Sequence, residues 1–437
     1  MAFEDIWVFR YNIPAMKIVF VLECANKLNN GTTATCNRFA DELRKKGHEV
    51  TILGTEFEDG EQHDNYVELP HFVFPLVEGL IRKEGFTFAR CDIVKIYNCI
   101  KDADLVHVFL PMKLGKTAQL IADALGIPVT TAFHLQPQNI SSAIHLGHLK
   151  FLNDILYAGF QRYLYHSVLR IHCPSSMIER EIRKHHYKEN ITHVISNGVI
   201  PFFKRIDVEK PAEFKDKIVV TMSGRLAQEK RQDLIIKAVA GSKYNDRIQI
   251  ILCGQGPNEK RYQKLARKKG LANPLIIRFC NAVELREILN YADVYVHASD
   301  FEIEGISAIE AITCGALPLI SDSKLSATNS FSLNDDICLF HHGSAKSLRT
   351  KLEWLIEHPE TVKELKIAYS LSAPRFALSR QVQAMEDMFY AAVDDKNKGF
   401  DLPTAKPLRR DLKRQKRIFK KLRKAGVIDD LPKSLQD

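Results

Sequence analysis

Short apolar strand patterns alternate with helical patterns in two separate series, and this alternation restricts the fold more than any other feature of the sequence. The first series opens at Met16 with MKIVFVLE, continues through an amphipathic helical stretch that stops at a Gly-His pair, and returns to a strand. Further strands are expected within ADLVHVFLP, LGIPVTTAFHL and RIHCPSSMIEREI. The alternation predicts a parallel sheet with helices on both faces, and a right-handed doubly wound topology is the simplest arrangement.

The alternation lapses near residue 200, where Pro, Gly and charged residues accumulate as in a linker, and then restarts. KIVVTMSGRL, IQIILCGQGP, PLIIRFC, ADVYVHAS and ALPLISD are five strand candidates separated by helical stretches. The expected fold is therefore α/β, with two doubly wound domains. The first domain is expected over 16–200, after an N-terminal extension or mis-assigned start over 1–15. A linker over 201–216 leads to a second domain over 217–374. A helix over 375–395 can return to the first domain, and a basic amphipathic tail follows over 396–437.

Composition places the chain among globular proteins. Its 437 residues are 45% hydrophobic and 26% charged, enough to bury real cores. The nine cysteines are scattered and never spaced as C-x-x-C, which argues against a disulfide framework or a zinc site and favours a reducing compartment. No window of about eighteen uncharged apolar residues occurs, and the N-terminus lacks the pattern of a secretion signal. We therefore expect a cytoplasmic location.

The net charge of +9 is concentrated in the tail, because residues 396–437 contain fourteen Lys or Arg against five Asp. In PLRRDLKRQKRIFKKLRKAG the apolar residues recur near helical spacing, as in a basic amphipathic helix at an anionic membrane, where each well-placed cation contributes about 1 kcal/mol. The cations expected at the membrane are Arg409, Arg410, Lys413, Arg414, Lys416, Arg417, Lys420 and Lys421. Nucleic acid is a less favoured partner, because this stretch has one aromatic residue and no RNA-binding module beside it. A solvated, partly disordered tail is the other alternative.

Two loops in the second series suit an anionic ligand, because ligands of open α/β sheets bind beyond the carboxyl ends of the strands. In GRLAQEKRQDL, Gly224, Arg225 and Lys230 precede a helix, and two cations beside a helix N-terminus suit a diphosphate. A solvated helix start is an equally open alternative. In GQGP, Gly254 and Gly256 form a tight turn that lets a ligand approach the backbone, although strand-to-helix turns use glycine in any case.

A third loop, within SDFEIEGISAIEAITCGALPLIS, places two carboxylates eight positions apart. Glu302 is expected in the loop after ADVYVHAS, Gly305 allows a turn, and Ile306 and Ser307 begin a helix that carries Glu310 inward. Carboxylates at such an edge are good acceptors for the vicinal hydroxyls of a ribose or hexose. A capping glutamate plus a surface glutamate is the alternative, against which the apolar context of Glu310 argues.

These motifs, in this order and spacing, resemble the donor-site motifs of retaining glycosyltransferases with two facing Rossmann-like domains and a central cleft. This is the GT-B architecture with its Glu-x7-Glu signature. ISNGV and NNGTTAT also match, so the resemblance covers about residues 16–390. It implies that Arg225 and Lys230 neutralise the nucleotide diphosphate, that Glu302 contacts the sugar and that Glu310 contacts the ribose.

The same resemblance implies roles for further residues. Gly305, Ile306 and Ser307 would offer backbone N–H groups to the sugar and phosphate. His134, just past a strand end in TTAFHLQPQNI, would contact the transferred sugar, although a lone histidine is usually structural. Gly31 and Thr32, in NNGTTAT, would form an acceptor or phosphate loop, but this motif has one glycine where many relatives carry a pair.

FHLQPQNI, HVISNGV and LVEGLIRKEGFTFARCD look like a narrower group, the bacterial membrane-associated glycosyltransferases that move glucose from UDP-glucose to diacylglycerol. The last stretch also suits an interfacial patch, with an ordinary buried helix and loop as the alternative. The residues of this patch would be Phe72, Phe74, Leu76, Val77, Leu80, Ile81, Phe86 and Phe88, interleaved with Arg82, Lys83 and Arg90.

The expected function is that of a retaining glycosyltransferase that moves a hexose, with UDP-glucose favoured as donor, to a lipid such as 1,2-diacylglycerol at the inner face of the cell membrane. Because Arg225, Lys230 and a helix N-terminus would stabilise the leaving diphosphate, neither a metal nor a tightly bound cofactor is expected. Two alternatives stay open. One is a glycosyltransferase acting on a cell-wall or polysaccharide precursor. The other is a catalytically silent partner subunit that binds a sugar nucleotide, against which the intact cations and glutamates argue.

Overall fold

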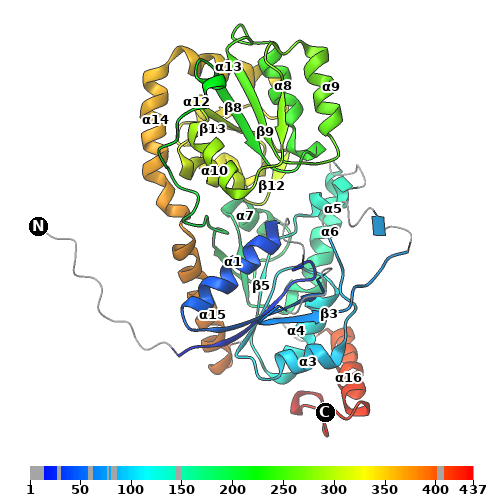
Figure 1. The fold of residues 1–437 in the computed structure, drawn as a ribbon. Helices are drawn as coiled ribbons and strands as arrows, with labels where there is room; N and C mark the ends of the chain where they lie inside the picture. Colours follow the sequence, from blue (N-terminus) through cyan, green and yellow to red (C-terminus); the bar gives the residue numbers. More distant parts are fainter. Residues whose placement is uncertain are drawn as a thin grey trace, which may run out of the picture.

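The computed structural model describes residues 14–26, 31–57, 63–75, 78–79, 86–143, 149–400 and 408–436. Two α/β domains are stacked one above the other, and the predicted fold class is confirmed (Figure 1). Of the predicted extension over 1–15, residues 1–13 lie outside the described residues, and the carbonyl of Pro14 accepts a hydrogen bond from the Tyr390 hydroxyl at 2.9 Å.

The N-terminal domain contains a seven-stranded parallel sheet in the order β3-β2-β1-β4-β5-β6-β7. Its strands are β1 (Lys17–Val21), β2 (Glu49–Thr55), β3 (Tyr66–Leu69), β4 (Leu105–Val108), β5 (Val129–Ala132), β6 (Arg170–Cys173) and β7 (Ile191–Val194). Its helices are α1 (Gly31–Lys45), α3 (Ile93–Ile100), α4 (Lys113–Leu125), α5 (Pro137–Ala143), α6 (Lys150–Tyr163) and α7 (Ser176–Lys184). Central strands such as β4 are buried along their whole length, which explains their unbroken apolar character.

The C-terminal domain contains a six-stranded parallel sheet in the order β10-β9-β8-β11-β13-β15 and a separate pair, β12-β14. Its strands are β8 (Ile218–Ser223), β9 (Ile248–Cys253), β10 (Ile276–Arg278), β11 (Val294–His297), β12 (Phe301–Glu302), β13 (Leu317–Ser321), β14 (Leu325–Ser326) and β15 (Leu339–Phe340). Its helices are α8 (Gln232–Ala240), α9 (Glu259–Lys269), α10 (Ala282–Tyr291), α11 (Ile306–Cys314), α12 (Asp335–Cys338), α13 (Ala345–Glu357) and α14 (Pro359–Ser372). All five expected strands are present, whereas the three two-residue strands carry no sequence signal.

The segment predicted as a linker, 201–216, belongs physically to the C-terminal domain. Phe203 and Phe214 are buried in the apolar core of that domain. The chain crosses between domains just before, near Val199, and crosses back at Ala377, where the two segments form a parallel β-bridge. The next helix, α15 (Leu378–Asn397), packs on α1, β5 and β6 of the N-terminal domain.

The last helix, α16 (Arg409–Lys424), lies in the predicted basic amphipathic tail. Phe419 and Leu422 are buried in the core of the N-terminal domain, and the helix packs on α3 and α4. The carboxylate of Asp411 pairs with the ammonium of Lys116 on α4 at 2.9 Å, and both side chains are buried. The expected helix is therefore confirmed, and its apolar face packs against the N-terminal domain. In Figure 1 this helix lies at the end of the N-terminal domain remote from the C-terminal domain.

The outer face of α16 is strongly cationic. The predicted membrane cations are exposed except for Lys416, which is partly buried. None of the helices in the described part of the chain combines the length and apolar character needed to cross a bilayer.

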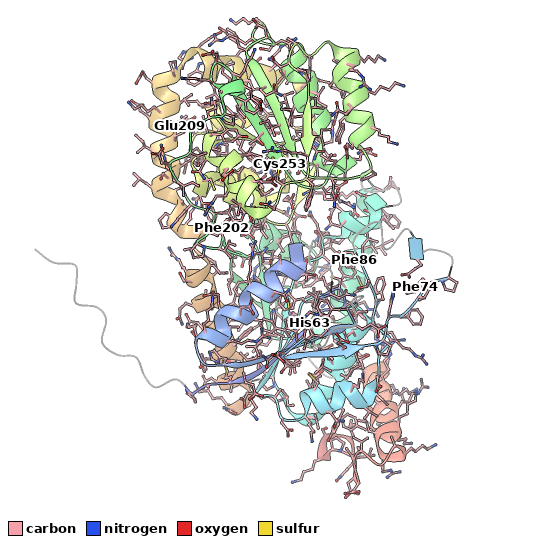
Figure 2. The ribbon with its side chains drawn as sticks, viewed as in Figure 1. His63, Phe74, Phe86, Phe202, Glu209 and Cys253 are labelled. Carbon is pink, nitrogen blue, oxygen red and sulfur yellow. The ribbon has the colours of Figure 1, made fainter. Side chains whose placement is uncertain are left out.

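The predicted interfacial patch is only partly described. Phe72, Phe74, Phe86 and Phe88 form a row of ring contacts with centroid distances of 4.8–6.4 Å. Figure 2 shows Phe74 and Phe86 on the same side of the N-terminal domain. The remaining apolar members of the patch and two of its cations lie outside the described residues; these are Leu76, Val77, Leu80, Ile81, Arg82 and Lys83.

The burial of Phe419 predicts that α16 stabilises the N-terminal domain. Phe419→Ala should lower the free energy of unfolding by about 3–5 kcal/mol, because it removes a large side chain from a packed core. Lys420→Ala, which changes the exposed neighbour, should leave stability nearly unchanged. Thermal unfolding followed by circular dichroism measures both, and equal midpoints for the two variants would show that α16 is not part of the core.

Candidate active site

The loops after β8 and β11 meet where the strand order of the second sheet reverses, which is the position at which open α/β sheets bind ligands. The amide of Asp300 donates to the carbonyl of Glu229 at 2.8 Å. The Arg231 guanidinium bonds the Asp300 carboxylate at 3.0 Å and that of Asp233 at 3.2 Å. These contacts fix the loop that carries Arg225 and Lys230 against the loop that leads to Glu302.

Lys230 and Glu302, both predicted donor-site residues, form an ion pair at 2.5 Å. The imidazole Nε2 of His297, at the end of β11, lies 3.6 Å from the same carboxylate oxygen. Burial alone would raise the pKa of Glu302, but Lys230 and His297 outweigh it and lower this pKa to about 2. Glu302 is therefore a carboxylate at neutral pH, able to accept hydroxyl groups but too weak a base to remove a proton from one.

Arg225 lies on the same loop and pairs with Glu229 at 3.0 Å. Its side chain is about a third exposed, against about a fifth for Lys230. Both cations that sequence reasoning assigned to the diphosphate thus contact carboxylates of their own domain. An anionic ligand would join an existing charge network here rather than meet two isolated cations.

The two glycines of GQGP are explained by close contact between loops. Gly254 has φ +156°, and a Cβ there would collide with the carbonyl oxygen of Gly224. A Cβ on Gly256 would lie 2.6 Å from the carbonyl oxygen of Leu226. The sequence GQGP therefore allows the loop after β9 to lie on the loop after β8. In Figure 2, Cys253, which precedes this turn, lies in the part of the C-terminal domain nearer the other domain.

Gly305 precedes α11 with φ +94°, a conformation that favours glycine. Ile306 and Ser307 are the first residues of that helix, where backbone N–H groups have no helical acceptor. The Ser307 hydroxyl accepts a hydrogen bond from the Tyr295 hydroxyl at 3.0 Å. The turn thus presents a helix N-terminus beside Glu302, the arrangement that suits a phosphate or sugar oxygen.

Glu310 is buried in the second turn of α11. Its nearest charged partner comes from the other domain, since the guanidinium of Arg38 on α1 lies 3.5 Å from its carboxylate. Burial raises the pKa of Glu310 to about 7, and Arg38 acts against that rise.

Three successive strand ends of the N-terminal domain contact the segment around Glu302. After β5, Gln136 donates to the carbonyl of Leu325 on β14 at 3.3 Å. After β6, the Ser175 hydroxyl donates to the carbonyl of Ile303 at 2.6 Å. After β7, the amide of Asn197, within ISNGV, donates to the carboxylate of Glu304 at 2.9 Å. The structure thereby brings both halves of the chain to the residues on either side of the Glu302 carboxylate.

His134 lies two residues before Gln136 and is buried. Neither ring nitrogen has a hydrogen-bond partner among the described residues, although His172 lies beside it with ring centroids 5.1 Å apart. Burial, followed by the nearby His172 and His107, holds the pKa of His134 well below its usual range. A neutral imidazole with two unpaired nitrogens can both donate to and accept from sugar hydroxyls.

Gly31 and Thr32 begin α1 on the N-terminal side. Among the described residues, nothing lies within 4 Å of a Cβ built on Gly31, so packing against them does not require glycine. Residues 27–30 lie outside the described residues, and the predicted acceptor or phosphate loop stays a prediction.

Sequence reasoning missed Arg38, His297 and Glu304. His297 could have been noticed as the polar end of an apolar strand, and Glu304 as a third carboxylate beside Gly305. Burial raises the pKa of Glu304 to about 7, and hydrogen bonds from Ser196 and Asn197 act against that rise. Arg38 has no local signal, because its partner is distant in sequence.

Comparison with known proteins identifies the type of enzyme to which this chain belongs. The model described as Glycosyltransferase Family 4 matches residues 29–201, and the model described as Glycosyl transferases group 1 matches residues 203–369. Anabaena Alr3699/HepE, solved in complex with UDP-glucose, shares the fold with a TM-score of 0.67 and 15% identity, over 86% of this chain and 100% of that one. This chain is a GT-B glycosyltransferase. It is of the group 1 and family 4 type, within the hexosyltransferases.

Curated relatives of this glycosyltransferase act on different substrates, according to their names. The alpha-monoglucosyldiacylglycerol synthase of Streptococcus pneumoniae is 24% identical over 79% of this chain and 80% of the relative. The synthase of the same name from Acholeplasma laidlawii is 23% identical over 88% and 99%. The GDP-mannose-dependent alpha-mannosyltransferase of Corynebacterium glutamicum is 24% identical over 70% and 72%.

The contact between the two glycine loops yields a prediction about the glycosyltransferase. Gly254→Ala should weaken nucleotide-sugar binding severely, because the new methyl group displaces the loop that carries Arg225. Gly270→Ala is the matched control, since Gly270 also has positive φ (+73°) but open space around its Cβ. The control should lose only about 1–2 kcal/mol of stability from backbone strain and keep its affinity. Calorimetric titration with nucleotide sugars measures the difference, and equal affinities would rule out the steric explanation.

Proposed function

We propose that this chain is a retaining hexosyltransferase that transfers glucose from UDP-glucose to a lipid acceptor such as 1,2-diacylglycerol at the inner face of the cell membrane. The observation that carries the proposal is the Lys230–Glu302 pair beside Arg225, at the point where the strand order of the second sheet reverses. Cations that can bind a diphosphate lie there beside a carboxylate that can bind sugar hydroxyls, and a nucleotide-sugar donor requires both.

In this proposal catalysis is mainly electrostatic. Arg225, Lys230 and the N-terminus of α11 stabilise the negative charge that develops on the diphosphate as the glycosidic bond to it breaks. Glu302 accepts sugar hydroxyls and fixes the ring. Because its pKa is held at about 2, we assign the proton of the acceptor hydroxyl to the departing phosphate oxygen instead. Attack from the same face as departure then retains the anomeric configuration.

His134 completes the sugar site from the N-terminal domain. Its neighbour Gln136 contacts β14, the strand paired with β12, which ends at Glu302. A neutral imidazole at that position can hydrogen-bond a sugar hydroxyl without adding charge. Burial favours this neutral form, as the lowered pKa of His134 indicates.

Two observations support a lipid acceptor. The relatives named as alpha-monoglucosyldiacylglycerol synthases match 79% and 88% of the chain. The exposed face of α16 adds a cationic surface suited to anionic headgroups, whereas its Phe419 and Leu422 are buried in the protein. Membrane attraction in this proposal therefore depends on charge from α16 rather than on insertion of that helix.

The donor assignment predicts that purified protein on vesicles with diacylglycerol releases UDP from UDP-glucose and forms a glycolipid. Arg225→Ala or Lys230→Ala should lower turnover by about 10²–10³, or 2.7–4 kcal/mol, because each removes a cation from the leaving diphosphate. Lys237→Ala is the control, a lysine on α8 that also pairs with a carboxylate, that of Asp233 at 2.6 Å.

The same assay, run with GDP-mannose and with other hydroxyl acceptors, separates the alternatives. Transfer only to a polysaccharide precursor would replace the lipid acceptor. Binding without transfer to any acceptor would favour the silent partner subunit. Turnover close to wild type in the folded Arg225→Ala and Lys230→Ala proteins would contradict the donor site.

The membrane assignment predicts a charge-dependent association through α16. Changing the exposed Lys413, Arg417 and Lys421 to Gln should release the protein from anionic vesicles while its fold and donor binding stay intact. Binding of the wild type should weaken with salt, because exposed charges are screened over about 8 Å at physiological ionic strength. The matched control changes Lys260, Lys264 and Lys268, which share the same spacing on the exposed face of α9. Equal sedimentation of both triple variants with vesicles would place the membrane contact elsewhere.

A further inference from the structure

The ion pair between Arg38 and Glu310 joins the two domains. Arg38 lies on α1 of the N-terminal domain, and its Nη2 is 3.5 Å from Oε1 of Glu310 on α11 of the C-terminal domain. The side chains are 21% and 10% exposed, so both are largely removed from water. A carboxylate assigned to the donor thus has its cation supplied from the opposite domain.

The surroundings of each group show why this pairing matters. On Arg38, Nη1 is buried and has no hydrogen-bond partner within the described ranges, so its own helix does not hold the guanidinium. Around Glu310 the titratable neighbours are Cys314 on the next turn of α11 and Tyr295 on β11, both neutral near pH 7 because burial raises the pKa of each. Arg38 is therefore the cation that acts on the Glu310 carboxylate.

We infer that Arg38 is a positioning residue for the donor nucleotide, which holds the Glu310 carboxylate in the form and place that accept the ribose hydroxyls. This inference rests on the proposed role of Glu310 toward the donor. Arg38 acts through Glu310 rather than on the substrate. The nucleotide end of the donor site is consequently complete only when α1 lies against α11.

The chemical reason is the difference between a carboxylate and a carboxylic acid. A carboxylate accepts hydrogen bonds on both oxygens, as two vicinal hydroxyls require, whereas the acid uses one oxygen as a donor. Burial raises the pKa of Glu310 to about 7 even with Arg38 in place. Without the guanidinium this pKa would rise further, and most of the protein at neutral pH would carry the acid.

The test is the pH dependence of nucleotide-sugar affinity, measured calorimetrically between pH 6 and 8.5 without acceptor. UDP-glucose and GDP-mannose are the probes, because both carry a ribose and neither diphosphate titrates in that range. The proteins are wild type, Arg38→Gln, Glu310→Gln and the double variant. Lys45→Gln serves as the control, since it removes an exposed cation of α1 that pairs within its own helix with Glu42.

For wild type we expect affinity to rise with pH through about 7, because the ionised form of Glu310 binds and is populated above its pKa. Arg38→Gln should bind on the order of fivefold more weakly at pH 7 and approach wild type at pH 8.5, since the inflection moves to higher pH. Lys45→Gln should match wild type throughout. Glu304 and Cys280 also have pKa values near 7, so the assignment depends on differences between variants.

The double variant decides whether Arg38 acts through Glu310. Once Glu310 is Gln, removing Arg38 should cost no further affinity and change no inflection. Additional loss would mean that Arg38 contacts the nucleotide itself, and would overturn the inference. Tighter binding by Arg38→Gln would show that Arg38 competes with the donor, and a loss independent of pH would show a structural role; either result also overturns it. If wild type binds no nucleotide sugar, the proposed function fails as well.

Discussion

The arrangement of the site depends on three consecutive residues, 302–304, that are held by contacts from both domains. Glu302 pairs with Lys230 of its own domain, the carbonyl of Ile303 accepts from Ser175, and Glu304 accepts from the amide of Asn197. A displacement of either domain therefore moves the backbone that carries the Glu302 carboxylate, the proposed sugar ligand. This explains why a segment with so little regular structure can place a side chain accurately.

Charge at the site is organised in the same paired way. Arg225, Lys230 and Arg231 each contact a carboxylate, and so does Arg38 from the other domain. Partly buried charges are costly unless they are paired, and each of these cations has a carboxylate to neutralise it. A diphosphate would enter by exchanging partners with these carboxylates, and the carboxylates so released would become available to hydroxyl groups.

The two sheets, and the meeting of the loops at the proposed donor site, were predictable from the sequence because both follow from local patterns. Apolar runs such as that of β9 reveal buried parallel strands, and residues just beyond them must gather at one edge of the sheet. Pairings between distant segments were not predictable, since nothing local to Arg38 indicates Glu310. The partner of the apolar face of α16 was not predictable from the sequence either. Its period indicates that an apolar stripe must be covered, but not whether lipid or protein covers it.

The two crossings between the domains run side by side. The amide of Val199 donates to the carbonyl of Phe376 at 2.9 Å, and the amide of Leu378 donates to the carbonyl of Val199 at 3.1 Å. Gly198 has φ +71° and no room for a Cβ, because the backbone of Leu378 passes 2.9 Å from where that atom would lie. A single covalent tether permits twisting as well as bending. Two tethers bonded to each other act as a hinge with one axis. The two domains can therefore open by rotation about that axis, with little twisting of one domain relative to the other.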